Sequence, residues 1–137
     1  MTKLIGRFFF IAAFLFSFLP VSASEPEVVK GVSRELAIYR KKVIGQINYQ
    51  LNLDIPLERK KAIQASESIT FKLLGNKYNL QLDFRENGEK VKSIQVNGKN
   101  TGVVFKAEHL IIDRSLLIVG ENHIQLVFEA GESALNR

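Results

Sequence analysis

Cysteine and tryptophan are absent from this sequence of 137 residues, and histidine occurs only twice. Without cysteine, disulfides cannot hold the fold, so it must depend on its hydrophobic core, and a lipid anchor on an amino-terminal cysteine is excluded. Without tryptophan, the chain lacks one of the aromatic side chains on which sugar-binding proteins stack carbohydrate. These absences exclude a disulfide framework and a cysteine nucleophile.

The two histidines, His109 and His123, lie fourteen positions apart. Zinc peptidases use two histidines four residues apart on a helix, with a glutamate beside the first as general base. The two histidines do not form this pattern, so we interpret both as ordinary surface or strand-end residues. The sequence therefore predicts no metal ligand and no cofactor within this chain.

Other catalytic patterns are missing as well. No serine lies in a Gly-x-Ser-x-Gly turn with a paired histidine, and no glycine-rich loop that could hold a phosphate occurs. The carboxylates are scattered, and we interpret them as solvated charges on polar strand faces. The sequence thus predicts no catalytic residue.

The amino-terminal segment has the pattern of a secretory signal peptide. Lys3 and Arg7 precede an apolar run of twelve residues, 8–19, and small residues end at Ala23. A helix that spans a bilayer needs roughly 20 apolar residues, so we expect no stable membrane span. The pattern predicts cleavage between Ala23 and Ser24, with export to the periplasm or the medium.

The charge of the remaining chain is only mildly basic. Without Lys3 and Arg7 it has 17 basic and 14 acidic residues, a net charge of +3, which is too small to indicate a nucleic-acid partner. Two basic clusters, Arg40-Lys41-Lys42 and Arg59-Lys60-Lys61, are interpreted as a solvated helix end and a loop. A site for an anionic partner is the alternative interpretation of both clusters.

The first elements of the exported domain follow from local patterns. Residues 24–32 are expected to be a short flexible lead-in. Ser33 can cap a helix over 33–42, because its hydroxyl can accept from free amides of the first turn and the basic cluster 40–42 falls in the last turn. From Ile47 to Ile55 every second residue is apolar, which predicts a strand with one face toward a core.

Further strands and turns complete an all-β pattern. Asn97-Gly98 suits the two positive-φ positions of a hairpin turn, and Asn87-Gly88 and Gly75-Asn76 are further turn signals. Short apolar or alternating runs predict strands at 69–73, 80–84, 94–96, 103–105, 110–112 and 124–128. About seven short strands and one short amino-terminal helix predict an antiparallel β-sandwich.

The aromatic side chains are assigned by the phase of their strands. Those in the apolar phase are predicted to be core residues: Tyr49, Phe71, Phe84 and Phe128. Tyr39 and Tyr78 are the remaining candidates for an exposed aromatic platform.

Several segments resemble a known family when they are read in order. They are Ser33-Arg34-Glu35-Leu36-Ala37, Tyr39-Arg40-Lys41, Tyr49-Gln50-Leu51-Asn52-Leu53-Asp54-Ile55-Pro56, Ile69-Thr70-Phe71, Leu82-Asp83-Phe84, Val96-Asn97-Gly98, Gly120-Glu121-Asn122 and the segment from Phe128 to Arg137. This series is similar to the amino-terminal part of the aminopeptidase N family of zinc metallopeptidases, in the exported form common among bacteria.

The resemblance implies a saddle-like antiparallel β-domain, over residues 33–137, that packs on a thermolysin-like zinc domain. In that family the zinc domain removes amino-terminal residues from peptides, so the peptide substrates and the zinc belong to the partner domain. The family's Gly-Ala-Met-Glu-Asn and His-Glu-x-x-His motifs do not occur in this sequence, so no catalytic residue is carried over and the chain is expected to be inactive alone. Because family members have further strands after the Leu-Asn-Arg segment, the resemblance implies a partial domain.

Two other functions remain open at this point. The same sandwich could be a stand-alone secreted module that binds protein or glycan. It could also be an exported structural protein without a ligand of its own.

Overall fold

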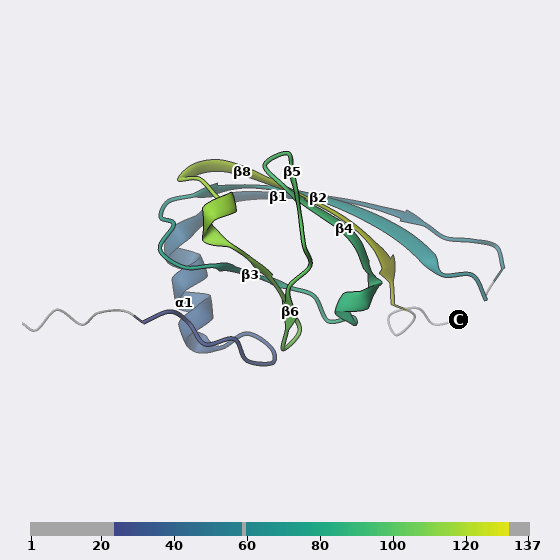
Figure 1. Cartoon of the computed structure of the whole chain (residues 1–137), viewed down its shortest axis with the longest axis horizontal. Coiled ribbons are helices and arrows are strands. Elements are labelled where there is room, and N and C mark those ends of the chain that lie inside the picture. The colour runs from purple at the N-terminus through teal and green to yellow at the C-terminus, as the bar shows by residue number, and fades with distance from the viewer. Residues whose placement is uncertain (1–23, 59, 132–137) are drawn as a thin grey trace, which may run out of the picture.

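Two antiparallel sheets face each other in the computed structural model, which describes residues 24–58 and 60–131 (Figure 1). The larger sheet has the strand order β1-β2-β8-β4-β5 and the smaller has the order β3-β7-β6. The strands are β1 (Ile44–Asp54), β2 (Ile63–Leu73), β3 (Leu80–Asp83), β4 (Val91–Val96), β5 (Lys99–Thr101), β6 (Phe105–Lys106), β7 (His109–Ile112) and β8 (Gly120–Ala130). The predicted antiparallel all-β sandwich is confirmed. The leader at 1–23, Arg59 and the segment 132–137 lie outside the described residues.

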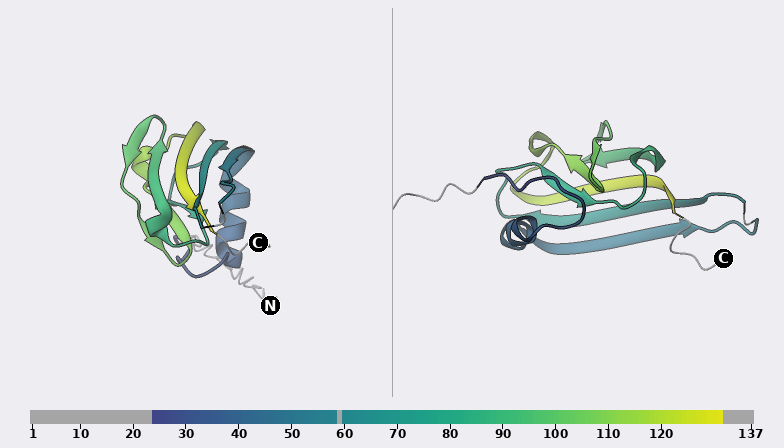
Figure 2. Two further views of the ribbon diagram at one scale, coloured as in Figure 1. Left: turned by 90° about the vertical axis from the view of Figure 1, so that its right-hand side faces the viewer. Right: turned by 90° about the horizontal axis from the view of Figure 1, so that it is seen from below.

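The helix that the sequence predicts is α1 (Arg34–Val43), and Ser33 is its N-cap. The Leu36 amide donates to Ser33 Oγ over 3.1 Å, as the capping pattern predicted. Leu36 and Val43 are buried, and both views in Figure 2 place the helix beside one end of β1. Two short 3₁₀ helices, η1 (Gly88–Lys90) and η2 (Arg114–Leu116), complete the elements of the described residues.

The lead-in before α1 has no helix or strand, but part of it packs on the smaller sheet. Pro26 is buried, and its carbonyl oxygen accepts a hydrogen bond of 2.9 Å from Gln81 Nε2 in β3. Lys30 forms an ion pair of 3.0 Å with Glu108. These contacts attach the segment to the fold ahead of the helix.

The core lies between the two sheets, around the central strand β8. Pairing places Ile69 of β2 opposite Ile124 of β8, and Ile94 of β4 opposite Leu126. The predicted core residues Phe71 and Phe84 are buried, and Phe128, which is partly buried, meets Phe84 edge to face at 5.4 Å. The other core side chains include Val43, Leu73, Leu80, Val91, Val96, Leu110, Ile112 and Leu117.

The Asn97-Gly98 turn forms as predicted and is tied to a buried asparagine. Asn97 and Gly98 have φ values of 49° and 80°, and the turn joins β4 to β5. Asn122, which is buried, accepts from Asn97 Nδ2 and from the Ile118 amide, both over 2.9 Å. Its own amide group donates to the carbonyls of Ile118 and Gly120. The Asn122 side chain therefore joins the turn to the start of β8.

The strand expected at 103–105 is the main error among the strand assignments. Only Phe105 of that run is in a strand, β6, while the short strand β5 was not expected. The tight turn at Asn97 returns the chain immediately beside β4, so Thr101 pairs with Ile94 although the segment Lys99–Thr101 is polar. Hairpin geometry, and not apolar alternation, sets this strand.

Tyr49 is exposed, which corrects its assignment to the core. It belongs to the apolar positions of β1 and the residue after it, which we call the β1 row. Each member is about half exposed: Ile47 49%, Tyr49 57%, Leu51 52%, Leu53 49% and Ile55 57%. The alternation predicted the strand correctly, but β1 is an edge strand of the larger sheet. Figure 1 shows the β1–β2 hairpin extending past the smaller sheet, so no layer formed by the described residues covers the outer part of this row.

Candidate functional site

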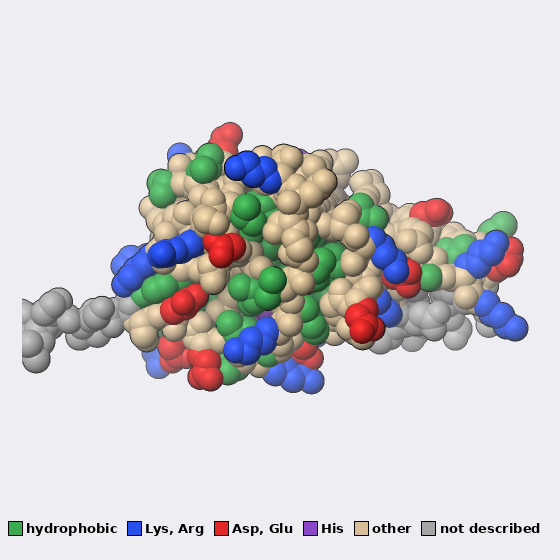
Figure 3. All heavy atoms as spheres, viewed as in Figure 1, with side chains coloured by type: hydrophobic (Ala, Val, Ile, Leu, Met, Phe, Trp, Pro, Cys, Tyr) green, Lys and Arg blue, Asp and Glu red, His purple; other side chains and the backbone are tan. Residues whose placement is uncertain are grey.

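The β1 row lies on the side of the larger sheet that faces the smaller sheet. Tyr49 pairs with Ile69, and Leu53 pairs with Ala65, both of which are buried core residues on that side. The row therefore continues the surface of the core outward to the sheet edge. Figure 3, which has the view of Figure 1 with β1 toward the back, shows apolar side chains in the middle of the front face and charges of both signs around them.

Glu67 interrupts this apolar surface. It lies on β2 between Leu51 of β1 and Leu126 of β8, at a position whose neighbours at 65 and 69 are core residues. Partial burial raises the pKa of the Glu67 carboxyl above its ordinary value. No other described residue donates a hydrogen bond to this carboxylate or forms an ion pair with it. The expectation that the carboxylates lie on polar strand faces is wrong for Glu67.

A groove of about 370 Å³ opens next to Glu67, between α1 and strands β1, β2 and β3. Its apolar wall includes Ile47, Tyr49 and Leu82, and its polar wall includes Arg40, Asp83 and Glu67. Known ligand pockets have volumes of about 300–1,000 Å³, so the groove has room for a small molecule or a side chain of a partner. We call it the Glu67 groove.

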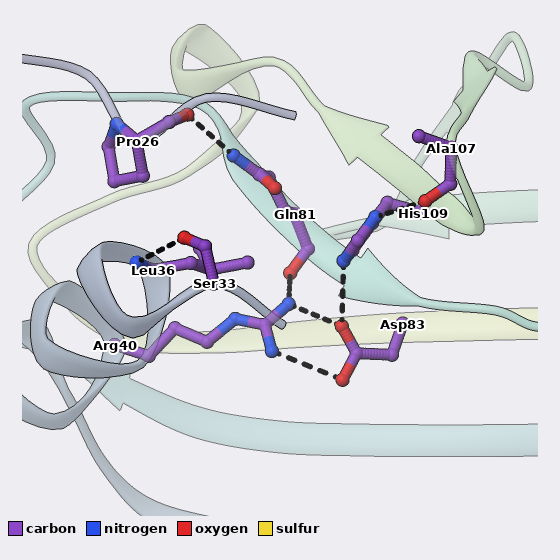
Figure 4. Close-up of polar contacts among 8 residues, drawn as sticks. All are labelled: Pro26, Ser33, Leu36, Arg40, Gln81, Asp83, Ala107 and His109. Carbon is purple, nitrogen blue, oxygen red and sulfur yellow. Dashed lines mark hydrogen bonds and ion pairs between the residues drawn. The ribbon is translucent and has the colours of Figure 1, made fainter. Parts of the chain in front are cut away.

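At the polar wall of the groove is a cluster of three side chains and one main-chain carbonyl, which Figure 4 draws. Arg40 of α1 binds Asp83 of β3 through both carboxylate oxygens, with Nη2–Oδ1 2.6 Å and Nη1–Oδ2 3.1 Å. Arg40 Nη2 also donates to the main-chain carbonyl of Gln81 over 2.5 Å. His109 of β7 places Nε2 3.2 Å from Asp83 Oδ1. We call these residues the Asp83 cluster.

His109 and Arg40 both differ from their sequence interpretation. His109 begins a strand, as expected, but its side chain is only 1% exposed and thus not a surface residue. Arg40 is 21% exposed and is held by Asp83, so it is not part of a solvated helix end. Lys41 and Lys42, the other members of that basic cluster, are exposed as expected. Lys60 and Lys61 are also exposed, on the loop between β1 and β2.

The contact between His109 and Asp83 is short, but it is not a well-formed hydrogen bond. His109 Nδ1 lies 2.7 Å from the Ala107 carbonyl oxygen, so Nδ1 carries a proton and donates it there. Nε2 lies within 4 Å of the Asp83 carboxylate and yet has no hydrogen-bond partner, since in the neutral ring the proton is on Nδ1. The 3.2 Å contact between His109 Nε2 and Asp83 Oδ1 is therefore an ion pair only when the ring is protonated.

The charge balance of Asp83 is dominated by its cationic neighbours. Burial acts to raise the pKa of Asp83, but the hydrogen bonds and charge of Arg40 more than offset it. His109 and Arg85 lower the pKa further. The pKa of Asp83 is therefore below its ordinary value, and the carboxyl group stays ionised at a lower pH than usual. The half-exposed carboxylate therefore joins α1, β3 and β7 at one point.

One serine–histidine pair forms that the sequence interpretation did not foresee. Ser68 Oγ lies 2.7 Å from His123 Nε2, on neighbouring strands and 55 residues apart in the chain. A catalytic serine also needs a group that orients its histidine, and no described residue donates to or accepts from the other ring nitrogen of His123. Strand pairing created the contact, and nothing in the local sequence indicates it. We interpret it as a hydrogen bond of the sheet surface.

The two tyrosines considered as an exposed platform pack on each other. The rings of Tyr39 and Tyr78 have centroids 5.3 Å apart, at an interplanar angle of 55°. Lys77 Nζ lies 4.9 Å from the centre of the Tyr78 ring. Both rings also line a hollow of about 730 Å³ between the lead-in and α1.

The described residues hold neither a metal-binding group nor a membrane-spanning helix. Within 24–58 and 60–131, no group of three or more His, Asp or Glu side chains is arranged to hold a metal ion. In the same ranges, no helix has the length and apolar character needed to cross a bilayer.

No family model matches the chain, and no curated protein matches it. The resemblance to the aminopeptidase N family therefore stays a prediction from the sequence.

Proposed function

We propose that this chain is a non-catalytic docking domain whose β1 row packs against an apolar surface of a partner domain. The observation that carries the proposal is the row itself, in which five apolar side chains at alternate positions are each about half exposed. Contiguous apolar patches on soluble proteins commonly mark interaction sites. Covering the row contributes roughly 25 cal/mol for each Å² of apolar surface removed from water.

The resemblance of the sequence supplies the identity of the partner in this proposal. The partner is a thermolysin-like zinc domain of an exported aminopeptidase, which removes amino-terminal residues with a zinc-activated water. Peptide substrates and zinc bind that domain, while this chain forms part of the wall beside them. The leader with Lys3, Arg7 and the apolar run 8–19 supports export, with cleavage after Ala23.

A second candidate function is a stand-alone secreted binding module. The Glu67 groove favours it, because the groove combines an apolar wall with an unpaired carboxylate and the Arg40–Asp83 pair. Such a mixture of apolar lining and a few polar groups is typical of ligand sites. In this alternative the occupant is a free ligand and not a domain of the same enzyme.

The coding DNA that follows codon 137 gives the first test. A continuing reading frame that encodes a His-Glu-x-x-His helix supports the aminopeptidase partner. A stop codon without a frameshift contradicts it and favours the stand-alone module.

Cysteine labelling of the extended protein gives the second test, and the cysteine-free chain suits it. Leu53→Cys is expected to react with a maleimide in a protein of residues 24–137 and to be protected in the protein that includes the partner domain. Thr70→Cys, on the opposite face of β2 and exposed, is the matched control and should react in both. Peptide mass spectrometry locates the label. If Leu53→Cys stays equally reactive in the extended protein, the docking proposal is wrong.

The non-catalytic part of the proposal has its own measurement. A protein of residues 24–137 is expected to release no product from aminoacyl anilides and to retain no stoichiometric zinc after dialysis. Turnover that a His109 or His123 substitution abolishes would overturn it.

A further inference from the structure

The outer edge of β1 is open as far as the described residues go. β1 is the first strand in the order of the larger sheet, so among the described residues it pairs only with β2. Natural edge strands are commonly protected by charged side chains, proline or bulges. Residues 44–53 contain no charge and no proline. A bulge between Gly45 and Asn48, with Gln46 at a φ of 52°, disrupts only the beginning of the strand. Residues 48–53 therefore form a regular edge without these protections.

This edge is self-complementary under a two-fold axis at Leu51. In an antiparallel second copy, Leu51 lies opposite its own counterpart and Tyr49 lies opposite Leu53. Apolar side chains therefore meet on the side of the sheet that carries the β1 row. On the other side Gln50 meets Asn52 and Asn48 meets Asp54. Each of these pairs joins an amide with an amide or a carboxylate. No pair in this register brings like charges together.

We propose that two copies of this chain associate through β1, in antiparallel register about Leu51, to form one continuous sheet. The backbone groups on the open edge of each copy become hydrogen-bonded, which is the usual gain of strand addition. The interface is isologous, as in most homodimers. This inference does not rest on the proposed docking function. Edge pairing leaves both β1 rows on the same side of the sheet, where they form a single apolar surface for a partner.

Single-cysteine variants test the register. Residues directly opposite in an antiparallel pair have Cα atoms about 4.5–5.5 Å apart, within the range of a disulfide. Leu51→Cys is therefore expected to form a disulfide-linked dimer under mild oxidation. Ile55→Cys is the control, because eight strand positions separate its two copies by about 26 Å. Ile55 and Leu51 are similarly exposed, and each belongs to the β1 row. Equal cross-linking of both variants would overturn the proposal.

Two double substitutions at the same exposed positions test the interface in solution. In this register residue 50 of each copy lies opposite residue 52 of the other. Gln50→Glu combined with Asn52→Glu therefore creates two pairs of facing glutamates and is expected to weaken dimerisation by about ten-fold. Gln50→Lys with Asn52→Glu places opposite charges there and should preserve the dimer. Sedimentation equilibrium of residues 24–137 measures the dissociation constants.

The alternatives give different results in the same measurement. A monomer at every soluble concentration would contradict the proposal. So would a dimer that the two double substitutions affect equally. A dimer that only Leu53→Ser weakens would show association through the apolar face, which contradicts edge pairing and leaves the docking proposal intact.

Discussion

Glu67 shows how one side chain can oppose the pattern of its strand. It occupies a position on the core side of β2, between Leu51 and Leu126, without a cation or donor among the described residues. Partial burial of a carboxylate that has no partner is unfavourable. Glu67 should therefore lower the stability of the single chain at neutral pH.

Replacing Glu67 with glutamine should stabilise the protein at neutral pH. The pKa of Glu67 is raised in the folded state, so its contribution is most favourable below about pH 4.5 and is lost as the pH rises through the folded-state pKa. Glu67→Gln should remove this loss, giving a higher free energy of unfolding at pH 7 and little difference at pH 4. Urea unfolding followed by circular dichroism measures both values.

Glu129→Gln is the control for that experiment. The hydrogen bond and charge of Lys92 lower the pKa of Glu129, so its ionised form is favoured by folding. Its substitution should therefore give no stabilisation at pH 7. A Glu67→Gln protein whose stability equals that of the parent at both pH values would contradict the assigned burial of Glu67.

Asn122 is a residue whose removal should be costly. Its side chain is buried and forms four hydrogen bonds, with Asn97, Gly120 and both main-chain groups of Ile118. Asn122→Ala leaves these partners without their hydrogen bonds. It should lower the free energy of unfolding by about 2–4 kcal/mol. Chemical denaturation measures the loss. Asn100→Ala, at an exposed position on β5, should change stability by less than about 0.5 kcal/mol.

At the scale of elements, the N-cap of α1 offers a direct test. Ser33→Ala removes the acceptor for the Leu36 amide and should lower the free energy of unfolding by about 1 kcal/mol. Ser33→Asp retains an acceptor at the cap and should lose much less. Thermal and urea unfolding of the two variants provide the comparison. Equal losses would show that the cap does not stabilise the fold.

Elements that depend on residues close together in the sequence could be predicted from it. The packing of other elements around them could not. The helix cap at Ser33 and the turn at Asn97-Gly98 depend on local chemistry, and both formed as expected. The alternation in β1 predicted a strand but could not reveal that it is an edge strand. Its pairing depends on β2, and the extent of its cover depends on the small sheet from 80–112.

The candidate site was predicted poorly for the same reason. Arg40, Asp83 and His109 come together from α1, β3 and β7, across distances in sequence that no local motif records. Glu67 had a usable signal, because it has the same strand phase as Ala65 and Ile69. A charge in an apolar phase indicates either a partner or a special role.

At the scale of the whole molecule, the β1 row should govern solubility more than stability. Tyr49→Ser with Leu53→Ser removes half-exposed apolar side chains, so aggregation and binding of an apolar dye should fall. The free energy of unfolding should change by only about 1 kcal/mol. Light scattering and dye fluorescence measure the first effect, and urea unfolding measures the second.

Leu126→Ala is the contrasting variant. This residue is 2% exposed in the central strand, and its truncation should cost about 2–5 kcal/mol. If the double serine variant aggregates as readily as the parent protein, the row is not the surface responsible for association.

The central place of β8 also affects how the chain folds as it is made. β8 lies between β2 and β4, although it is translated after both of them. Until residues 120–130 leave the ribosome, the β1–β2 hairpin and β4 have no strand to join them, and the core faces of Ile69 and Ile94 stay in water. Contacts of such long sequence separation form slowly and leave intermediates prone to aggregate. The nascent chain should therefore bind chaperones until β8 has been made.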